Sequence, residues 1–131
     1  MELIQVKFRS EWSLYSKNDL PENGLMLLSD FVIRPSSKLK ATARLSWFNT
    51  QSFNSRIYAY ENDIPYTFYI PAFPDKGLRF YLNISYKINK LITIYSKVSQ
   101  TSFYNTTPSI EIGKPSLNSS KKTDFRIHLK L

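Results

Sequence analysis

The feature of this sequence that most constrains its fold is a strict two-residue alternation of apolar and polar side chains. It is clearest in residues 124–131, where Phe125, Ile127, Leu129 and Leu131 alternate with Asp124, Arg126, His128 and Lys130. Successive side chains of a β-strand point to opposite faces, so this period predicts a strand with one apolar face. On a soluble edge strand an apolar row invites aggregation, whereas a membrane β-barrel strand has lipid on one face and the lumen on the other.

Five further segments share the alternation, and helical periodicity is weak throughout. With the terminal segment, the expected strands are residues 4–15, 25–34, 38–48, 78–88, 91–104 and 124–131. Several are long, whereas soluble strands average about 5–6 residues and membrane strands need about 9–11. We therefore expect an all-β chain, an antiparallel up-and-down meander of about six strands that is part of a transmembrane outer-membrane β-barrel. Residues 1–131 are expected to form a single, incomplete barrel segment.

The connections between these strands alternate in length. Residues 35–37 and 89–90 are tight turns, whereas the connections at 17–24, 49–77 and 105–122 are longer, and the second is expected to hold an extra hairpin at 56–70. Outer-membrane barrels have short periplasmic turns and long outer loops. If the C-terminus is periplasmic, both tight turns are periplasmic too, and the long connections near 49–77 and 105–122 are outer loops.

The net charge of +8 falls on one side of the expected sheet, because the apolar faces of the strands carry no charged residue. The candidate lumen residues that could face anions are Lys40, Arg44, Arg79, Lys97, Arg126 and Lys130. Rings of Lys and Arg line anion-selective pores, which gives one interpretation of this face. The other, which we favour, is that these cations are structural and pair with acids from the strands or from a plug outside this chain. Glu61 is expected only to help order the outer loop.

Large aromatic residues mark the two ends of the expected apolar band. Trp12, Trp47 and Phe80 fall near the long-loop end, and Tyr86 near the tight-turn end. Phe80 and Tyr86 are six residues apart, which is roughly 20 Å along a strand. Membrane barrels carry aromatic girdles at both edges of an apolar band, so these four residues are candidate interface aromatics. The alternative is that they fill a protein core.

Several classes of function find no support in the sequence. There is no cysteine, and no nucleophile motif, phosphate loop or metal-ligand spacing, so we expect no enzyme activity, metal or cofactor. The single histidine, His128, stands between two cations and is a poor base candidate. Nucleic-acid binding is not expected either, because alternation sends Phe80 to the face opposite Arg79. The first residues lack the pattern of a signal peptide, so an exported protein would need one further upstream.

Three stretches resemble a known family. They are Arg56-Ile57-Tyr58-Ala59-Tyr60-Glu61-Asn62-Asp63, Tyr69-Ile70-Pro71-Ala72-Phe73 and Lys76-Gly77-Leu78-Arg79-Phe80-Tyr81-Leu82. They are similar to the C-terminal β-barrel region of large Bacteroidota outer-membrane proteins, which are often labelled helix-hairpin-helix domain-containing. The resemblance covers most of residues 29–131 and implies a bacterial outer-membrane location. The chain departs from the family in the loop after Ser109 and in ending on Leu131 rather than Phe, and it lacks the helix-hairpin-helix part.

Six strands are too few for a closed bacterial barrel, and open edges in lipid leave unpaired backbone groups. The expected partners are therefore outer-membrane lipid and further barrel strands from an upstream segment, another chain or copies of this one, with other envelope proteins as candidates. The sequence predicts a wall segment of an outer-membrane barrel, acting as a transport channel or as the scaffold of an envelope complex. The alternative is a soluble β-barrel or sandwich that binds an anionic or apolar ligand, with Trp12 and Trp47 buried inside protein.

Overall fold

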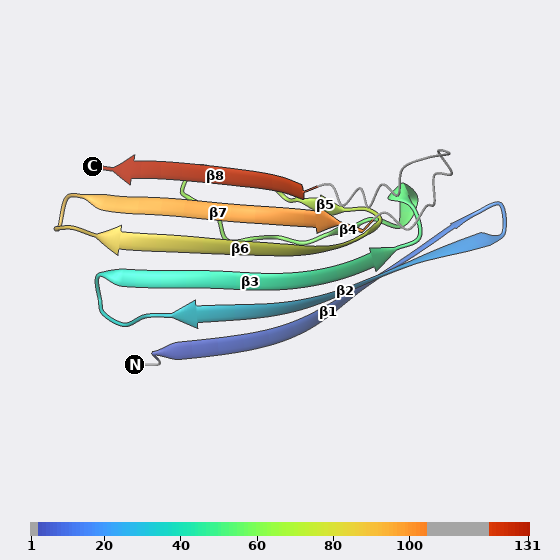
Figure 1. The fold of residues 1–131 in the computed structure, drawn as a ribbon, viewed down its shortest axis with the longest axis horizontal. Helices are drawn as coiled ribbons and strands as arrows, with labels where there is room; N and C mark the ends of the chain where they lie inside the picture. Colours follow the sequence, from blue (N-terminus) through green and yellow to red (C-terminus); the bar gives the residue numbers. More distant parts are fainter. Residues whose placement is uncertain (1–2, 105–120) are drawn as a thin grey trace, which may run out of the picture.

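One antiparallel sheet forms most of the molecule (Figure 1). The computed structural model describes residues 3–104 and 121–131. Its strands are β1 (Ile4–Lys17), β2 (Leu20–Ile33), β3 (Leu39–Thr50), β6 (Lys76–Lys87), β7 (Thr93–Phe103) and β8 (Lys121–Lys130). They pair in the order β1-β2-β3-β6-β7-β8, which is an up-and-down meander, with β1 and β8 as the edge strands. The expected all-β meander of six strands is confirmed, and the sheet is open within the residues described.

The long connection between β3 and β6 has structure of its own. It begins with a single turn of 3₁₀ helix, η1 (Phe53–Ser55), and contains two short paired strands, β4 (Ile57–Tyr58) and β5 (Ala72–Phe73). The hairpin expected at 56–70 is therefore displaced, because its ladder joins Ile57 to Phe73 and Tyr58 to Ala72. Among the described residues no helix is both long and apolar enough to cross a membrane.

The first hairpin corrects the expected connection at residues 17–24. The ladder between β1 and β2 runs through this stretch and joins Lys17 to Leu20. Only Asn18 and Asp19 form the turn, and both have left-handed backbone angles, with φ of 55° and 61°. Two-residue hairpin turns of this kind need positive φ at both positions, which Asn and Asp tolerate better than other side chains. The expected loop at 105–122 lies, apart from its last two residues, outside the described residues.

Both tight turns lie where they were expected, at the end of the sheet that also holds the N- and C-termini (Figure 1). The β1–β2 hairpin and the connection between β3 and β6 lie at the opposite end. Residues 105–120, which link β7 to β8, are not described. We call these two ends of the sheet the tight-turn end and the long-loop end.

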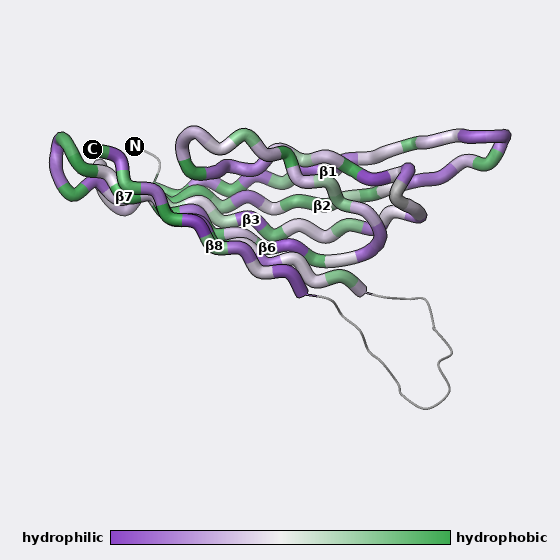
Figure 2. The backbone as a smooth tube through the Cα atoms, turned by 90° about the horizontal axis from the view of Figure 1, so that it is seen from above, coloured by the Kyte–Doolittle hydropathy of each residue, from purple (hydrophilic) through white to green (hydrophobic). Residues whose placement is uncertain are grey.

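Apolar and polar residues alternate over much of the sheet (Figure 2), and residues 25–28 of β2, which are all apolar, are an exception. The covered face of the sheet is the one that carries the polar residues of β3, because Thr42, Arg44 and Ser46 are buried. Residues 51–73, which we call the covering segment, fold over this face. A small apolar core forms between them at the long-loop end, made of Met26, Leu28, Phe48, Ile57, Ala59 and Phe73.

Two contacts show how closely the covering segment approaches the sheet. The rings of Phe48 and Phe73 lie 5.1 Å apart between their centroids. At Gly24 the Ser55 carbonyl oxygen would lie 2.7 Å from an added Cβ atom, so only glycine leaves room for the segment there. The Ser13 hydroxyl donates a hydrogen bond to the same carbonyl. Strand and segment are therefore joined by direct packing rather than by a loose crossing.

Candidate functional site

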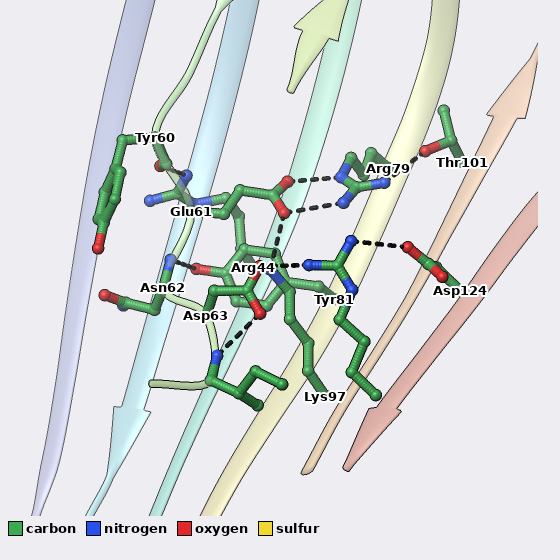
Figure 3. Close-up of polar contacts among 12 residues, drawn as sticks. Arg44, Tyr60, Glu61, Asn62, Asp63, Arg79, Tyr81, Lys97, Thr101 and Asp124 are labelled. Carbon is green, nitrogen blue, oxygen red and sulfur yellow. Dashed lines mark hydrogen bonds and ion pairs between the residues drawn. The ribbon is translucent and has the colours of Figure 1, made fainter. Parts of the chain in front are cut away.

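A cluster of charged side chains lies between the sheet and the covering segment (Figure 3). We call it the charge network. Its cations are Arg44 on β3, Arg79 on β6, Lys97 on β7 and Arg126 on β8, and its carboxylates are Asp30 on β2, Asp124 on β8 and Glu61 and Asp63 in the covering segment. The register places all four cations on one face, since directly paired residues of neighbouring strands point the same way. With four charges of each sign, this cluster is neutral as a whole.

Arg44 joins the sheet to the covering segment. It lies directly opposite Asp30 in the β2–β3 ladder. Its guanidinium makes a two-point ion pair with the Asp30 carboxylate, with Nη2 2.8 Å from Oδ2, and its Nη1 donates to the Tyr60 carbonyl oxygen at 2.6 Å. Such fork-like pairs fix orientation as well as adding energy. Arg44 therefore holds the backbone of the covering segment against β3.

Glu61 is the most enclosed carboxylate of the network, with 2% of its side chain exposed. Its two oxygens accept from Nε and Nη2 of Arg79, the second at 2.8 Å, and Oε2 also accepts from Lys97 Nζ at 3.1 Å. Arg79 completes its bonding by donating to the Thr101 hydroxyl at 2.7 Å. A carboxylate buried this deeply is tolerated only when it is paired, so Glu61 and its two cations depend on one another.

Asp63 lies between two cations that are direct partners in the β7–β8 ladder. Lys97 and Arg126 are direct partners in that ladder, and like charges in this position repel. Asp63 Oδ2 lies 3.2 Å from Lys97 Nζ and 2.9 Å from Arg126 Nη1, so one carboxylate bridges both cations. Arg126 is also paired with the more exposed Asp124 at 3.0 Å. The covering segment therefore supplies the charge that lets β7 and β8 place two cations side by side.

Tyr81 on β6 lies beneath the network and is fully buried. The Arg44 guanidinium lies 5.5 Å and Lys97 Nζ 4.7 Å from its ring centroid, which is within the range of cation–π attraction. Its hydroxyl accepts a long hydrogen bond of 3.4 Å from the Asn62 backbone amide. The ring thus separates two cations and touches the covering segment between Glu61 and Asp63.

The six candidate lumen cations fall into two groups, four that are ion-paired and two that are exposed. Arg44, Arg79, Lys97 and Arg126 are paired with acids of this chain, whereas Lys40 and Lys130 are exposed and take no part in the network. The interpretation favoured from the sequence pairs these cations with acids from the strands or from a plug outside this chain. The acids that pair with these four cations in the structure belong to β2, β8 and the covering segment of the chain itself.

The four candidate interface aromatics lie on the opposite, uncovered face. Trp12 is 77% exposed, and Trp47, Phe80 and Tyr86 are each about 40% exposed. Many neighbours on that face are equally open, including Phe8 at 78% and Phe125 at 64%. Within the described residues these aromatics therefore do not fill a core.

Sequence reasoning missed the carboxylates of the network. Glu61 was assigned only to loop order and Asp63 was not singled out, yet both face the sheet. They are two residues apart, and both carboxylates pair with cations of the sheet. That spacing opposite a cationic sheet face was the available signal.

His128 lies in ring contact with Tyr66 and Tyr95, at centroid distances of 5.8 and 6.1 Å.

Within residues 3–104 and 121–131 there is no group of His, Cys, Asp or Glu side chains that could hold a metal ion. The acids of the network are already occupied by cations. No protein-family model, curated protein or solved structure matches this chain.

Proposed function

We propose that this chain is a wall segment of a bacterial outer-membrane β-barrel, with its uncovered apolar face toward lipid and its charged face toward the lumen. One observation carries the proposal. The sheet exposes most of its large apolar residues on one face and covers most charges of the network on the other, which is the reverse of what a sheet exposed to water does.

The uncovered face carries exposed apolar residues over most of the sheet. Side chains at least 38% exposed there come from five of the six long strands, among them Phe8 and Trp12 of β1, Phe31 of β2, Trp47 of β3, Phe80 of β6 and Ile127 of β8. Soluble monomers rarely expose apolar patches beyond a few hundred Å². A lipid phase covers such a face without any further protein, and the resemblance to Bacteroidota barrel termini supports the outer membrane as that phase.

The two edge strands require partners under this proposal. Unpaired backbone groups cost several kcal/mol each in lipid, so β1 and β8 have to pair with further strands. These strands come from an upstream segment, another chain or a second copy. The C-terminus and both tight turns lie at one end of the sheet (Figure 1). Under this proposal that end is the periplasmic one.

The covering segment determines how wide the proposed lumen is. It folds inward over the charged face and is held there by the charge network, so that it narrows the lumen toward the long-loop end. A fixed inward segment of this kind suits either a selective transport channel or a closed barrel that serves as a scaffold for other envelope proteins.

Lipid-phase quenching of tryptophan tests the proposal. The chain has two tryptophans, so Trp12→Phe and Trp47→Phe each leave a single reporter. In vesicles containing lipids brominated along the acyl chain, both reporters are expected to be quenched strongly and to resist the aqueous quencher iodide. Reporters that resist both quenchers would instead support the alternative, a soluble barrel or sandwich in which a second protein layer covers this face.

A further inference from the structure

The tight-turn end of the sheet holds basic residues that the charge network does not use. They are Arg34, Lys38, Lys40, Lys87, Lys90 and Lys130. The stretches that form this end, residues 3–6, 31–43, 83–95 and 127–131, contain no Asp or Glu. Charge on the covered face is thus divided into two zones, a neutralised one under the covering segment and an uncompensated one at the two tight turns.

Two turns meet around a hollow at this end. Its volume is about 670 Å³, and its polar lining is formed by Ser37, Lys38, Lys87, Asn89, Lys90 and Thr93. Ligand sites in proteins usually measure about 300–1,000 Å³. The lining offers ammonium groups, hydroxyls and an amide, and it offers no carboxylate.

Both turns around the hollow are ordered by hydrogen bonds between residues close in sequence. The Ser36 hydroxyl oxygen accepts from the Lys38 and Leu39 amides at 3.3 and 3.2 Å. The Asn89 side-chain oxygen accepts from the Leu91 and Ile92 amides, both at 2.8 Å. Because its oxygen is used in this way, the Asn89 amide group is left with its NH₂ as the part that can serve a ligand.

A backbone bond ties the two turns to each other. The Lys87 amide donates to the Lys38 carbonyl oxygen at 2.8 Å, so the main chains that carry these two lysines are neighbours. Bringing like charges together is unfavourable unless an anion lies between them. In the charge network, Asp63 offsets the repulsion between Lys97 and Arg126. Among the described residues no equivalent acid lies at the tight turns.

We propose that this hollow, the turn-end site, binds a phosphate group. Three lysines present nine N–H donors in total when fully protonated. A phosphate carries up to two charges and several strong acceptor oxygens, which matches this set better than a single carboxylate does. The phosphate belongs either to a soluble anion entering the lumen mouth or to the headgroup of an anionic phospholipid. The second source is considered because Ile88 and Leu91 of the same turn are exposed apolar residues, 46% and 77% exposed.

The test compares two triple variants with equal loss of charge. Lys38→Gln/Lys87→Gln/Lys90→Gln removes the lysines of the turn-end site, and Lys17→Gln/Lys121→Gln/Lys122→Gln removes three exposed lysines at the long-loop end. The full chain is prepared in lauryldimethylamine oxide, a detergent without phosphate, and circular dichroism checks the strand content of each variant. Amide NMR shifts of Ser37, Asn89 and Lys90 then report binding.

Two probes distinguish the sources of phosphate. Inorganic pyrophosphate represents a soluble anion. Dihexanoyl phosphatidylglycerol represents an anionic lipid, and dihexanoyl phosphatidylcholine, whose phosphate is balanced by its own choline cation, is its zwitterionic control. The parent chain is expected to bind at least one probe saturably, and the turn-end variant to bind it about tenfold more weakly, since each exposed charge contact contributes modestly. The long-loop variant is expected to change by less than about threefold.

The outcomes are separable from those of the proposed function. Saturation by pyrophosphate alone assigns the site to a soluble anion, and saturation by phosphatidylglycerol alone assigns it to lipid. Absence of saturable binding to either probe, or equal weakening in both triple variants, overturns the turn-end site. The turn-end site rests on the proposed function only for its placement at a lumen mouth. If the tryptophans are not quenched by lipid but pyrophosphate still binds, the barrel proposal is refuted and the turn-end site stands.

Discussion

Removing the charge of Glu61 is the sharpest test of the charge network. In Glu61→Gln the side chain keeps its shape and loses its negative charge. Arg79, with 12% of its side chain exposed, then keeps an amide oxygen and the Thr101 hydroxyl as partners, and Lys97, with 5% exposed, keeps the amide oxygen and Asp63. Breaking one side of a buried ion pair costs about 3–5 kcal/mol because an uncompensated charge stays buried. We expect a loss of that size in the free energy of unfolding.

The measurement is urea unfolding of the protein refolded into lipid vesicles, followed by tryptophan fluorescence. Asp124→Asn is the matched control, because Asp124 also pairs with an arginine of the network but its side chain is 51% exposed. Exposed ion pairs contribute about 0–1 kcal/mol, so the control is expected to lose less than about 1 kcal/mol.

A triple variant distinguishes the cost of an unpaired buried charge from the cost of lost packing. In Glu61→Leu/Arg79→Met/Lys97→Met the buried group around Glu61 becomes apolar while Asp63 keeps Arg126 as its partner. Such replacements of buried ion pairs are often neutral or stabilising. We expect it to recover most of the stability that Glu61→Gln loses. If Glu61→Gln and Asp124→Asn lose the same small amount, the covering segment is not held by buried charge and the reasoning is refuted.

Three further predictions concern the fold, and each is checked by the same unfolding measurement. Gly24→Ala is expected to destabilise by about 1–3 kcal/mol, because its Cβ would clash with Ser13 Oγ and lie 2.7 Å from the Ser55 carbonyl oxygen; an unchanged stability would mean that the covering segment does not approach β2. Phe48→Ala is expected to cost about 3–5 kcal/mol, since Phe48 is fully buried against the segment, whereas Phe8→Ala on the uncovered face should cost clearly less in detergent. Asn18→Val is expected to cost about 1–2 kcal/mol because φ is 55° there, while Asn18→Gly should be tolerated; equal effects of the two would argue against the two-residue turn.

The sheet was predictable from the sequence because alternation is a local signal. Residues 38–48 and 78–88 were expected as strands and form β3 (Leu39–Thr50) and β6 (Lys76–Lys87). The β1–β2 turn was missed for a local reason as well. Pro21 and the polar residues around it are typical of a loop, and the turn at Asn18 and Asp19 has no glycine to mark it.

The charge network was predictable only in part. Alternation placed Arg44, Arg79, Lys97 and Arg126 on one face, but no periodic signal exists for the covering segment that pairs with them. Its key contacts are distant in sequence, since Glu61 is 18 residues from Arg79 and 36 from Lys97. Contacts of that range depend on how the chain folds back, which residue patterns alone do not specify.

The bridge between Asp63 and Arg126 has a consequence for the order in which the chain assembles. These residues are 63 positions apart, and the bond joins the last strand to a segment that lies before β6. Contacts between distant parts of a chain form late, because the intervening loop must first be closed. Until the covering segment is in place, β8 would bring Arg126 against Lys97 with no acid between them. We therefore expect β8 to pair with β7 only after the covering segment has folded onto the sheet.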